Sequence, residues 1–272
     1  MWPDGFVICF WPVSCAYYRQ ILHNKKVPSA MYKKIIALFV MVQPAMALAA
    51  DAPSSNTFFN DFSFSGTVAV TSDYAYRGIT QNDEKITPQL GVEIGHSSGA
   101  YVGIWGSPVD FNDGGEAHSE VDFTLGYRYE SGPWSTDTRY TYFAYPGARS
   151  SLHYDYGEAA FSLTRDFDVL SIGGMVAYSP NYASDSGDAY YVQALLDVPL
   201  PKDFAAHAYV GKQYVDDNAA YGYPDAIDWN LGVSYTYDAI GLDLSYIDTN
   251  ISKAQCADGC SGRVVGTLSY SF

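Results

Sequence analysis

The sequence predicts an all-β protein: a closed up-and-down antiparallel transmembrane β-barrel of about 12 strands. Three observations lead to this prediction. Segments of about ten residues alternate between apolar and polar side chains. Long and short links between these segments follow one another in strict alternation. The chain is also rich in aromatic residues, with 25 Tyr, 14 Phe and 5 Trp, although only 17% of its residues are charged.

Residues 31–49 have the features of a secretory signal peptide. Lys33 and Lys34 precede an apolar run at 35–42, and small residues that suit cleavage follow at 45–49. The apolar run is about half the roughly 20 residues that a membrane-spanning helix requires. We therefore expect this segment to be cleaved and not retained as an anchor.

The signal peptide sets the remaining boundaries and the charge of the mature chain. Residues 1–30 lie upstream of a complete signal, so we interpret them as a mis-assigned start or as an extension removed with it. Residues 50–61 form a short N-terminal segment before the predicted barrel at 62–272. Five of the 15 Lys and Arg and one of the 30 Asp and Glu lie before residue 50, which leaves a net charge near −19. Such a surface repels nucleic acid, which is excluded as a partner.

Two cysteines remain after the predicted signal peptide, Cys256 and Cys260 in the stretch QCADGCSG. An even pair in an exported chain predicts a disulfide, and closing so tight a loop contributes about 2 kcal/mol. Two cysteines without a neighbouring histidine make a poor metal site. The sequence therefore predicts no metal site and no cofactor.

The alternation is clearest in two segments. Residues 121–130 place Val, Phe, Leu and two Tyr on one face, opposite Asp, Thr, Gly, Arg and Glu. Residues 227–237 show the same pattern, with Ile, Trp, Leu, Val and two Tyr on the apolar face. The other predicted strands are 62–73, 86–95, 99–107, 134–144, 154–165, 169–179, 188–198, 203–214, 240–247 and 263–272.

The links between these strands indicate how the strands are connected. The links after odd-numbered strands are long, as in YAYRGITQNDEK and DTNISKAQCADGCSG, whereas those after even-numbered strands are as short as HSS, SGP or DA. An up-and-down meander has this property when one end carries tight turns and the other carries elaborated loops. With an even number of strands, both termini lie at the short-turn end.

The polarity of the two faces distinguishes a soluble barrel from a membrane barrel. A soluble sandwich or lipocalin-like barrel buries its apolar faces, whereas an outer-membrane barrel turns them toward lipid and places aromatic girdles at both interfaces. The polar faces here carry Gly, Ser, Thr and Asn, whereas a soluble surface carries more Lys and Glu. Turning strand 121–130 over would expose Arg128 to lipid, which costs up to about 2–4 kcal/mol at the midplane. The sequence therefore favours the outer-membrane barrel.

The last predicted strand has the pattern of an assembly signal. In VVGTLSYSF, apolar residues occupy alternate positions and end at Tyr270 and Phe272. This ending resembles the carboxy-terminal β-signal that the barrel-assembly machinery of bacteria recognises. A terminal strand of this kind must then pair with the first strand to close the barrel.

Several stretches together resemble the TorF family of proteobacterial porins: SDYAYRGITQ at 72–81, AYVGIWGSPVDF at 100–111, EVDFTLGYR at 120–128, YTYFAYPG at 140–147, DWNLGVSYTYDAIGLDLSYIDTN at 228–250 and the ending CSGRVVGTLSYSF. The resemblance covers nearly all of the chain from residue 62 onward. It implies an outer-membrane β-barrel, with channel activity, in a Gram-negative bacterium. It implies no particular solute, and no catalytic or binding residues are carried over from it.

The polar faces supply candidates for the lining of a pore, because rings of charged side chains set selectivity in channels. Arg77 lies where the first strand enters a long link. It is interpreted either as a constriction or gating residue or, as we favour, as a partner in a salt bridge. The pore-lining candidates are Arg77, Glu93, Asp122, Arg128, Arg139, Asp228, Asp243 and Arg263.

These features predict a porin-like channel for the passive diffusion of small polar solutes or ions. Barrels of about eight strands fill their own interior and those of about 16 leave a channel, so 12 strands are intermediate. A narrow structural barrel, whose inner charges pair across it, is therefore an alternative. An adhesin acting through the long acidic links is another.

A barrel hydrolase is the least favoured alternative. His118 and His153 follow long links, and either could pair with a distant serine. The sequence contains no nucleophile elbow, histidine pair for a metal or phosphate-binding glycine loop, so we predict that the protein is not an enzyme. The expected partners are outer-membrane lipid and lipopolysaccharide, the barrel-assembly machinery and small solutes. The expected location is the cell outer membrane.

Overall fold

Twelve strands form one closed barrel. The structure, a computed structural model, describes residues 61–111, 117–256 and 259–272. Around the barrel the order is β1, β14, β13, β12, β11, β10, β9, β8, β7, β6, β5 and β4, with antiparallel neighbours throughout. Strands β2 and β3 pair with each other in the link between β1 and β4. The fold class predicted from the sequence is confirmed.

The barrel strands are β1 Phe62–Thr71, β4 Thr87–His96, β5 Ala100–Pro108, β6 Ser119–Ser131, β7 Trp134–Ala144, β8 Tyr156–Asp166, β9 Ser171–Ser179, β10 Ala189–Leu200, β11 Phe204–Val215, β12 Ala226–Tyr237, β13 Ile240–Thr249 and β14 Arg263–Ser271. Every strand end lies within two residues of the predicted one. The links contain β2 Ala75–Tyr76, β3 Ile79–Thr80, η2 Ser150–Leu152, η3 Ala183–Asp185 and α2 Asn218–Tyr221. No helix in the described ranges is long and apolar enough to cross a membrane.

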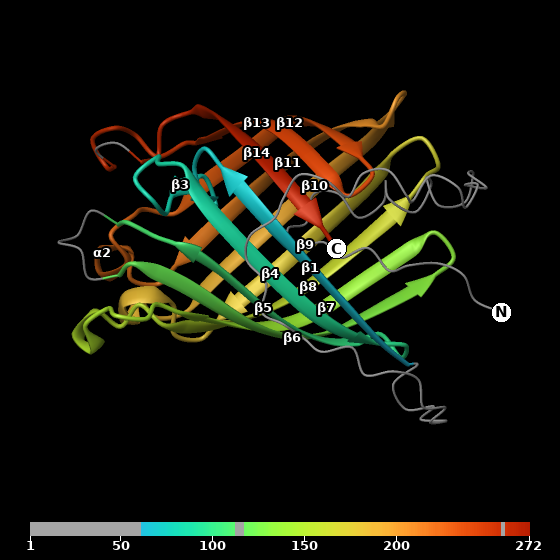
Figure 1. The fold of residues 1–272 in the computed structure, drawn as a ribbon. Coiled ribbons are helices and arrows are strands. Elements are labelled where there is room, and N and C mark those ends of the chain that lie inside the picture. The colour runs from blue at the N-terminus through green and yellow to red at the C-terminus, as the bar shows by residue number, and fades with distance from the viewer. Residues whose placement is uncertain (1–60, 112–116, 257–258) are drawn as a thin grey trace, which may run out of the picture.

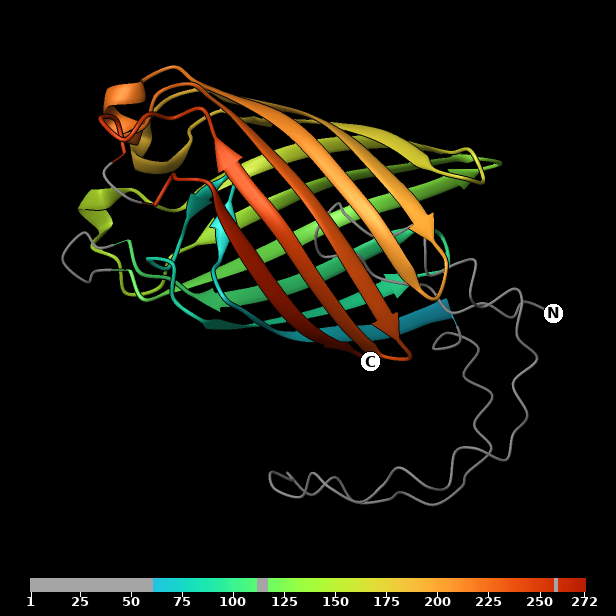
Figure 2. The same cartoon turned by 90° about the horizontal axis from the view of Figure 1, so that it is seen from above.

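The two ends of the barrel differ in the length of their links, as predicted. The long links, including α2, gather at the left end in Figures 1 and 2, and the tight turns lie at the right end. The tight turns use residues in the left-handed region, such as Gly132 at φ +57° and Asp238 at φ +54°. Such residues match the twist of paired strands in short hairpins.

The polarity of the wall is the reverse of that in a soluble protein. On the outer face, Leu125 and Leu231 are 62% and 63% exposed. On the inner face, the carboxylates of Glu120 and Asp228 are almost fully buried. The strands are nine to 13 residues long, which suits a tilted crossing of the hydrocarbon layer. Side-chain alternation along each strand therefore separates a lipid-compatible exterior from a polar interior.

The barrel closes between its first and last strands. Thr67 to Thr71 of β1 pair with Ser271 to Thr267 of β14. Gly66 and Phe272 extend the seam by exchanging two backbone hydrogen bonds of 2.9 Å. The ring of Phe272 covers Gly66 so closely that a Cβ there would overlap it. The terminal aromatic residue thus packs over the junction on the outer face.

Candidate pore interior

The long link between β1 and β4 folds into the barrel. Its strands β2 and β3 form an inward hairpin (residues 75–80) whose turn residues, Arg77 and Gly78, have φ values of +49° and +81°. Positive φ at both positions is the type I′ geometry of a two-residue hairpin. This conformation is uncommon for arginine, so the contacts around the side chain must hold it in place.

Arg77 reaches from the hairpin to the opposite wall. Its Nη2 donates to both carboxylate oxygens of Glu158 on β8, at 2.8 and 2.7 Å, and its Nη1 donates to Gln213 on β11 at 2.6 Å. The guanidinium also lies 4.1 Å from the ring centroid of Tyr191 on β10. Burial alone would lower the pKa of Arg77, but Glu158 and nearby tyrosines raise that pKa well above its ordinary value. The hairpin is therefore joined to the far wall by an ion pair in which Arg77 stays charged.

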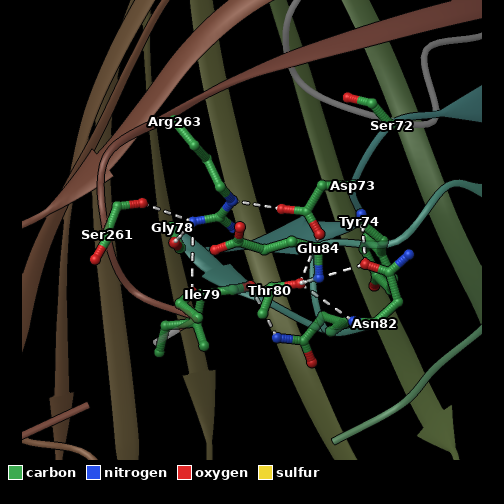
Figure 3. A network of polar contacts seen from close by, with 12 residues as sticks. Ser72, Asp73, Tyr74, Gly78, Ile79, Thr80, Asn82, Glu84, Ser261 and Arg263 are labelled. Carbon is green, nitrogen blue, oxygen red and sulfur yellow. Dashed lines mark hydrogen bonds and ion pairs between the residues drawn. The ribbon is translucent and has the colours of Figure 1, made fainter. Parts of the chain in front are cut away.

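A second ion pair fixes the base of the hairpin to the last strand (Figure 3). Arg263 Nε donates to Asp73 Oδ2 at 2.6 Å, and the Thr80 hydroxyl donates to Asp73 Oδ1 at 2.5 Å. Arg263 Nη1 also donates to the carbonyl of Gly78 at 3.3 Å. A Cβ at Gly78 would overlap the Thr249 side chain, so the turn fits closely against the wall.

The link between β13 and β14 packs against the same hairpin. The Thr80 backbone N–H donates to the carbonyl of Gly259 at 2.8 Å. Ile79 is buried together with Ile251 and Cys260. Cys256 and Cys260 are joined in a disulfide, which lies beside this contact.

An aromatic cluster fills the remainder of the long-loop end. Phe143 stacks on Tyr156 at a centroid distance of 4.5 Å, and Tyr156 meets Tyr182 at 4.6 Å. Tyr74 donates its hydroxyl to Glu120 at 3.0 Å. Burial raises the pKa values of the Tyr74 and Tyr182 phenols, so both stay neutral. This end of the lumen resembles a protein core more than a water-filled passage.

The short-turn half of the lumen is organised around Arg128. Its guanidinium makes two bonds to Glu93, at 2.6 and 2.9 Å, and a third to Asp137 at 3.1 Å. It also lies 3.7 Å from the ring centroid of Tyr101. Arg139 joins the group through Asp137 at 3.5 Å. The side chains of Arg128 and Arg139 are 29% and 27% exposed, so this group reaches water.

Tyr101 lies flat against the wall because the adjacent strand has a glycine beneath it. A Cβ at Gly126 would overlap the Tyr101 ring, and the hydroxyl crosses this position to donate to Asp137 on the next strand. One inward side chain thereby connects three successive strands. The same arrangement is formed by Tyr191, Gly211 and Asp228.

His207 forms a third connection of this kind, which sequence reasoning missed. The imidazole lies over Gly232 on the adjacent strand, where a Cβ would overlap it. Its Nε2 lies 3.0 Å from Ser245 Oγ and 3.5 Å from Asp243 Oδ2 on the next strand. Ser245 itself donates to Asp243 at 2.6 Å. In a hydrolytic triad the acid and the serine lie on different nitrogens of the histidine. Here both approach Nε2, so the arrangement differs from that of a triad.

The predicted pore-lining residues all lie inside the barrel, in separate groups. Arg77 and Arg263 hold the hairpin, whereas the buried Glu93 pairs with the partly exposed Arg128, and Arg139 joins this group through Asp137. Asp122 is the inward neighbour of Glu120 on β6, Asp228 accepts from Tyr191, and Asp243 lies beside His207.

Other predicted residues lie away from the lumen. His118 and His153 are exposed at the long-loop end, where His153 Nδ1 lies 3.1 Å from Asp185. Tyr270 and Phe272 lie on the outer face beside the seam. The signal-peptide prediction at 31–49 falls outside the described residues.

Five inward carboxylates were not among the eight pore-lining candidates: Asp73, Glu120, Asp137, Glu158 and Asp197. Strand alternation could have identified four of them, Glu120, Asp137, Glu158 and Asp197, because each is in phase with buried neighbours. Asp73 lies just beyond β1 but within the predicted strand 62–73 and in phase with the buried Thr71, so the same alternation could have identified it.

The closed sheet, its apolar exterior and its charged interior are the architecture of a porin-like β-barrel. The chain belongs to a family described as a bacterial protein of unknown function (Gcw_chp), which matches residues 55–271. None of the curated proteins compared with the chain matches it.

Solved porins are similar to the chain in fold. A NanC porin structure has a TM-score of 0.53 at 11% identity, covering 77% of this chain and 99% of that one. A KdgM porin in complex with disordered oligogalacturonate scores 0.49 at 13% identity, with 77% and 98% covered. The Salmonella typhi OmpF complex with daunomycin scores 0.45 at 7% identity, with 78% and 97% covered. At 11% identity, the likeness to the NanC porin is one of fold.

Proposed function

We propose that this protein is a channel of the outer membrane for the passive diffusion of small polar solutes or ions, narrowed at its long-loop mouth by the inward hairpin. The observation that carries the proposal is the inverted polarity of the wall. Outward-facing apolar side chains meet lipid, closure satisfies the backbone, and charged side chains face the interior.

The finer expectations from the sequence are part of this proposal. They are export through a cleaved signal peptide at 31–49, recognition of Tyr270 and Phe272 by the barrel-assembly machinery, and contact with lipopolysaccharide. They also include membership of the TorF family, and the assignment of the eight pore-lining residues to the conduction path.

A narrow structural barrel is the second candidate, and one observation favours it. The hairpin and the aromatic cluster occupy the long-loop end, where the side chains of Arg77 and Glu158 are only 8% and 10% exposed. A barrel closed in this way would brace the membrane without conducting. The two candidates therefore differ in what happens when the hairpin is removed.

The experiment is an excision of Ala75–Thr80. The Gln81 N–H already donates to the Tyr74 carbonyl at 2.7 Å, so a Gly-Gly linker can join the two ends without moving them. Wild-type and excised proteins are refolded and tested for stepwise conductance in planar bilayers. A matched control replaces the exposed turn Ser150–Leu152, in another long link, with the same linker.

We expect conductance steps from the wild type and larger steps from the excised variant, with the control like the wild type. A silent wild type beside a conducting excised variant would also support a channel, with the hairpin as its closure. If neither protein conducts, although their mobility on unboiled gels shows that both barrels are folded, the proposal is contradicted and the structural barrel is supported.

A further inference from the structure

The interior contains four arginines, and each is already neutralised. Arg77 pairs with Glu158, and Arg263 pairs with Asp73. In the other half of the lumen, the paired groups are Arg128, Arg139, Glu93 and Asp137. Each inward positive charge therefore has its own carboxylate.

Away from the exposed rims, five more carboxylates face inward: Glu120, Asp122, Asp197, Asp228 and Asp243. Within the described ranges none of them lies within ion-pair distance of a lysine or arginine. Glu120 and Asp228 accept from tyrosine hydroxyls, and Asp243 from a serine. The interior therefore has more acidic than basic side chains.

Two of these acids are placed to act on ions in water. Asp197 lies three residues before the end of β10, and Asp243 lies three residues after the start of β13. Both therefore lie near the short-turn end of their strands, away from the hairpin. The side chain of Asp243 is 32% exposed and Asp197 is partly exposed. Glu120 and Asp228, in contrast, are buried behind tyrosines.

His207 lies between the two acids and fixes their surroundings. It is the cross-strand partner of Asp197, and its Nε2 lies 3.5 Å from Asp243. Ser245 holds one Asp243 oxygen at 2.6 Å. These contacts place two carboxylates on one section of the inner wall, where low-dielectric surroundings strengthen their field.

We propose that the channel prefers cations, and that Asp197 and Asp243 are the residues that determine this preference. The inference rests on the proposed function, since selectivity requires a conducting pore. The permeant class is small inorganic or organic cations. The paired group at Arg128 contributes little net field because its charges cancel.

The test measures the reversal potential of single channels in an asymmetric KCl gradient, with the hairpin-excised variant used if the wild type is closed. We expect a potential displaced toward that of potassium. A unit charge acting across about 8 Å of water changes ion occupancy about twofold. Because the same charge raises potassium occupancy and lowers chloride occupancy, Asp197→Asn and Asp243→Asn should each lower the potassium-to-chloride permeability ratio about fourfold, and together about 16-fold. The preference should also weaken as salt increases.

Asp168→Asn is the matched control, because it removes the same charge from an exposed short turn outside the wall. It should leave the ratio unchanged, and Asp243→Glu should retain the wild-type preference. Conducting channels that favour chloride, or whose ratio does not respond to the two Asn variants, would overturn the inference and leave the channel function intact. Silence from both the wild type and the excised variant would instead reject the channel function, and the inference with it.

Discussion

The two halves of the lumen use the same pattern of side chains in different ways. In the long-loop half, Arg77 and its carboxylate are nearly inaccessible, and rings of tyrosine and phenylalanine pack around the hairpin. In the short-turn half, Arg128, Arg139 and Asp243 are between 27% and 32% exposed. One half therefore behaves as a packed core with buried ion pairs, and the other as a polar wall that meets water.

This difference determines what each charge contributes. Breaking a buried ion pair leaves an uncompensated charge without solvent, which is strongly destabilising. A pair that reaches water contributes little to stability, because solvent screens it. Charges at the long-loop end therefore hold the hairpin in place, whereas the pairs at the short-turn end that reach water contribute less to stability.

Of the variants predicted to test the difference between the two halves, Arg77→Ala should have the largest effect on stability and conductance. The change leaves Glu158 buried without its partner, which should lower the free energy of unfolding by about 3–5 kcal/mol. The hairpin should also detach from the far wall and raise conductance. Urea titration followed on unboiled gels measures the first effect, and bilayer recording the second.

Two further variants separate the lost ion pair from lost packing. Arg77→Lys keeps the charge but cannot make all three of the bonds that Arg77 forms with Glu158 and Gln213, so it should lie between wild type and Arg77→Ala. Adding Glu158→Gln to Arg77→Ala should restore part of the stability. An Arg77→Ala protein as stable as Arg139→Ala, which breaks a pair whose members are 27% and 22% exposed, would show that the two halves do not differ as described.

The strands that form the walls of both halves could be predicted from the sequence. A strand with lipid on one side and polar groups on the other alternates between apolar and polar residues. Each of the twelve strands therefore left a local signal, such as the alternation in 121–130. The ends of the strands were also marked, because aromatic residues and turn residues gather there.

The inward hairpin could not be predicted from the sequence, because the residues that it contacts are distant in the chain. Arg77 bonds to residues 81 and 136 positions away, and Arg263 to one 190 positions away. Only the Arg-Gly pair between the short runs AY and IT indicates a tight turn, and that signal does not say which way the link folds. The paired state of the inner charges was equally hidden, since alternation gives the face of a residue and not its neighbour.

A smaller effect is expected from adding a methyl group beneath the inward tyrosines. At Gly211 and Gly126 a Cβ would overlap Tyr191 and Tyr101 respectively, so alanine at either site should cost about 1–3 kcal/mol. Gly211→Ala should in addition raise conductance, because Tyr191 supports Arg77. Gly126→Ala should leave conductance near that of the wild type.

Gly266→Ala is the matched control, because the nearest atom to its Cβ would be Leu244 Cδ1 at 3.9 Å. Its stability should equal that of the wild type on the same urea titration. If both overlapping variants raised conductance equally, the hairpin would not depend on the wall beneath it, and the contrast between the two halves would be lost.

The smallest effect concerns the tyrosines at the long-loop mouth. Burial raises the pKa values of Tyr74, Tyr145 and Tyr182, whereas phenols in water ionise near pH 10. Keeping these phenols neutral therefore contributes fully to the free energy of unfolding below the ordinary tyrosine pKa. This contribution declines as pH rises above that pKa. In an alkaline titration followed by phenolate absorbance, a late step should coincide with unfolding on unboiled gels, and Tyr182→Phe should reduce its amplitude. Ionisation of all the tyrosines of the barrel near pH 10, while the barrel stays folded, would show that water reaches the mouth, as it does the other half.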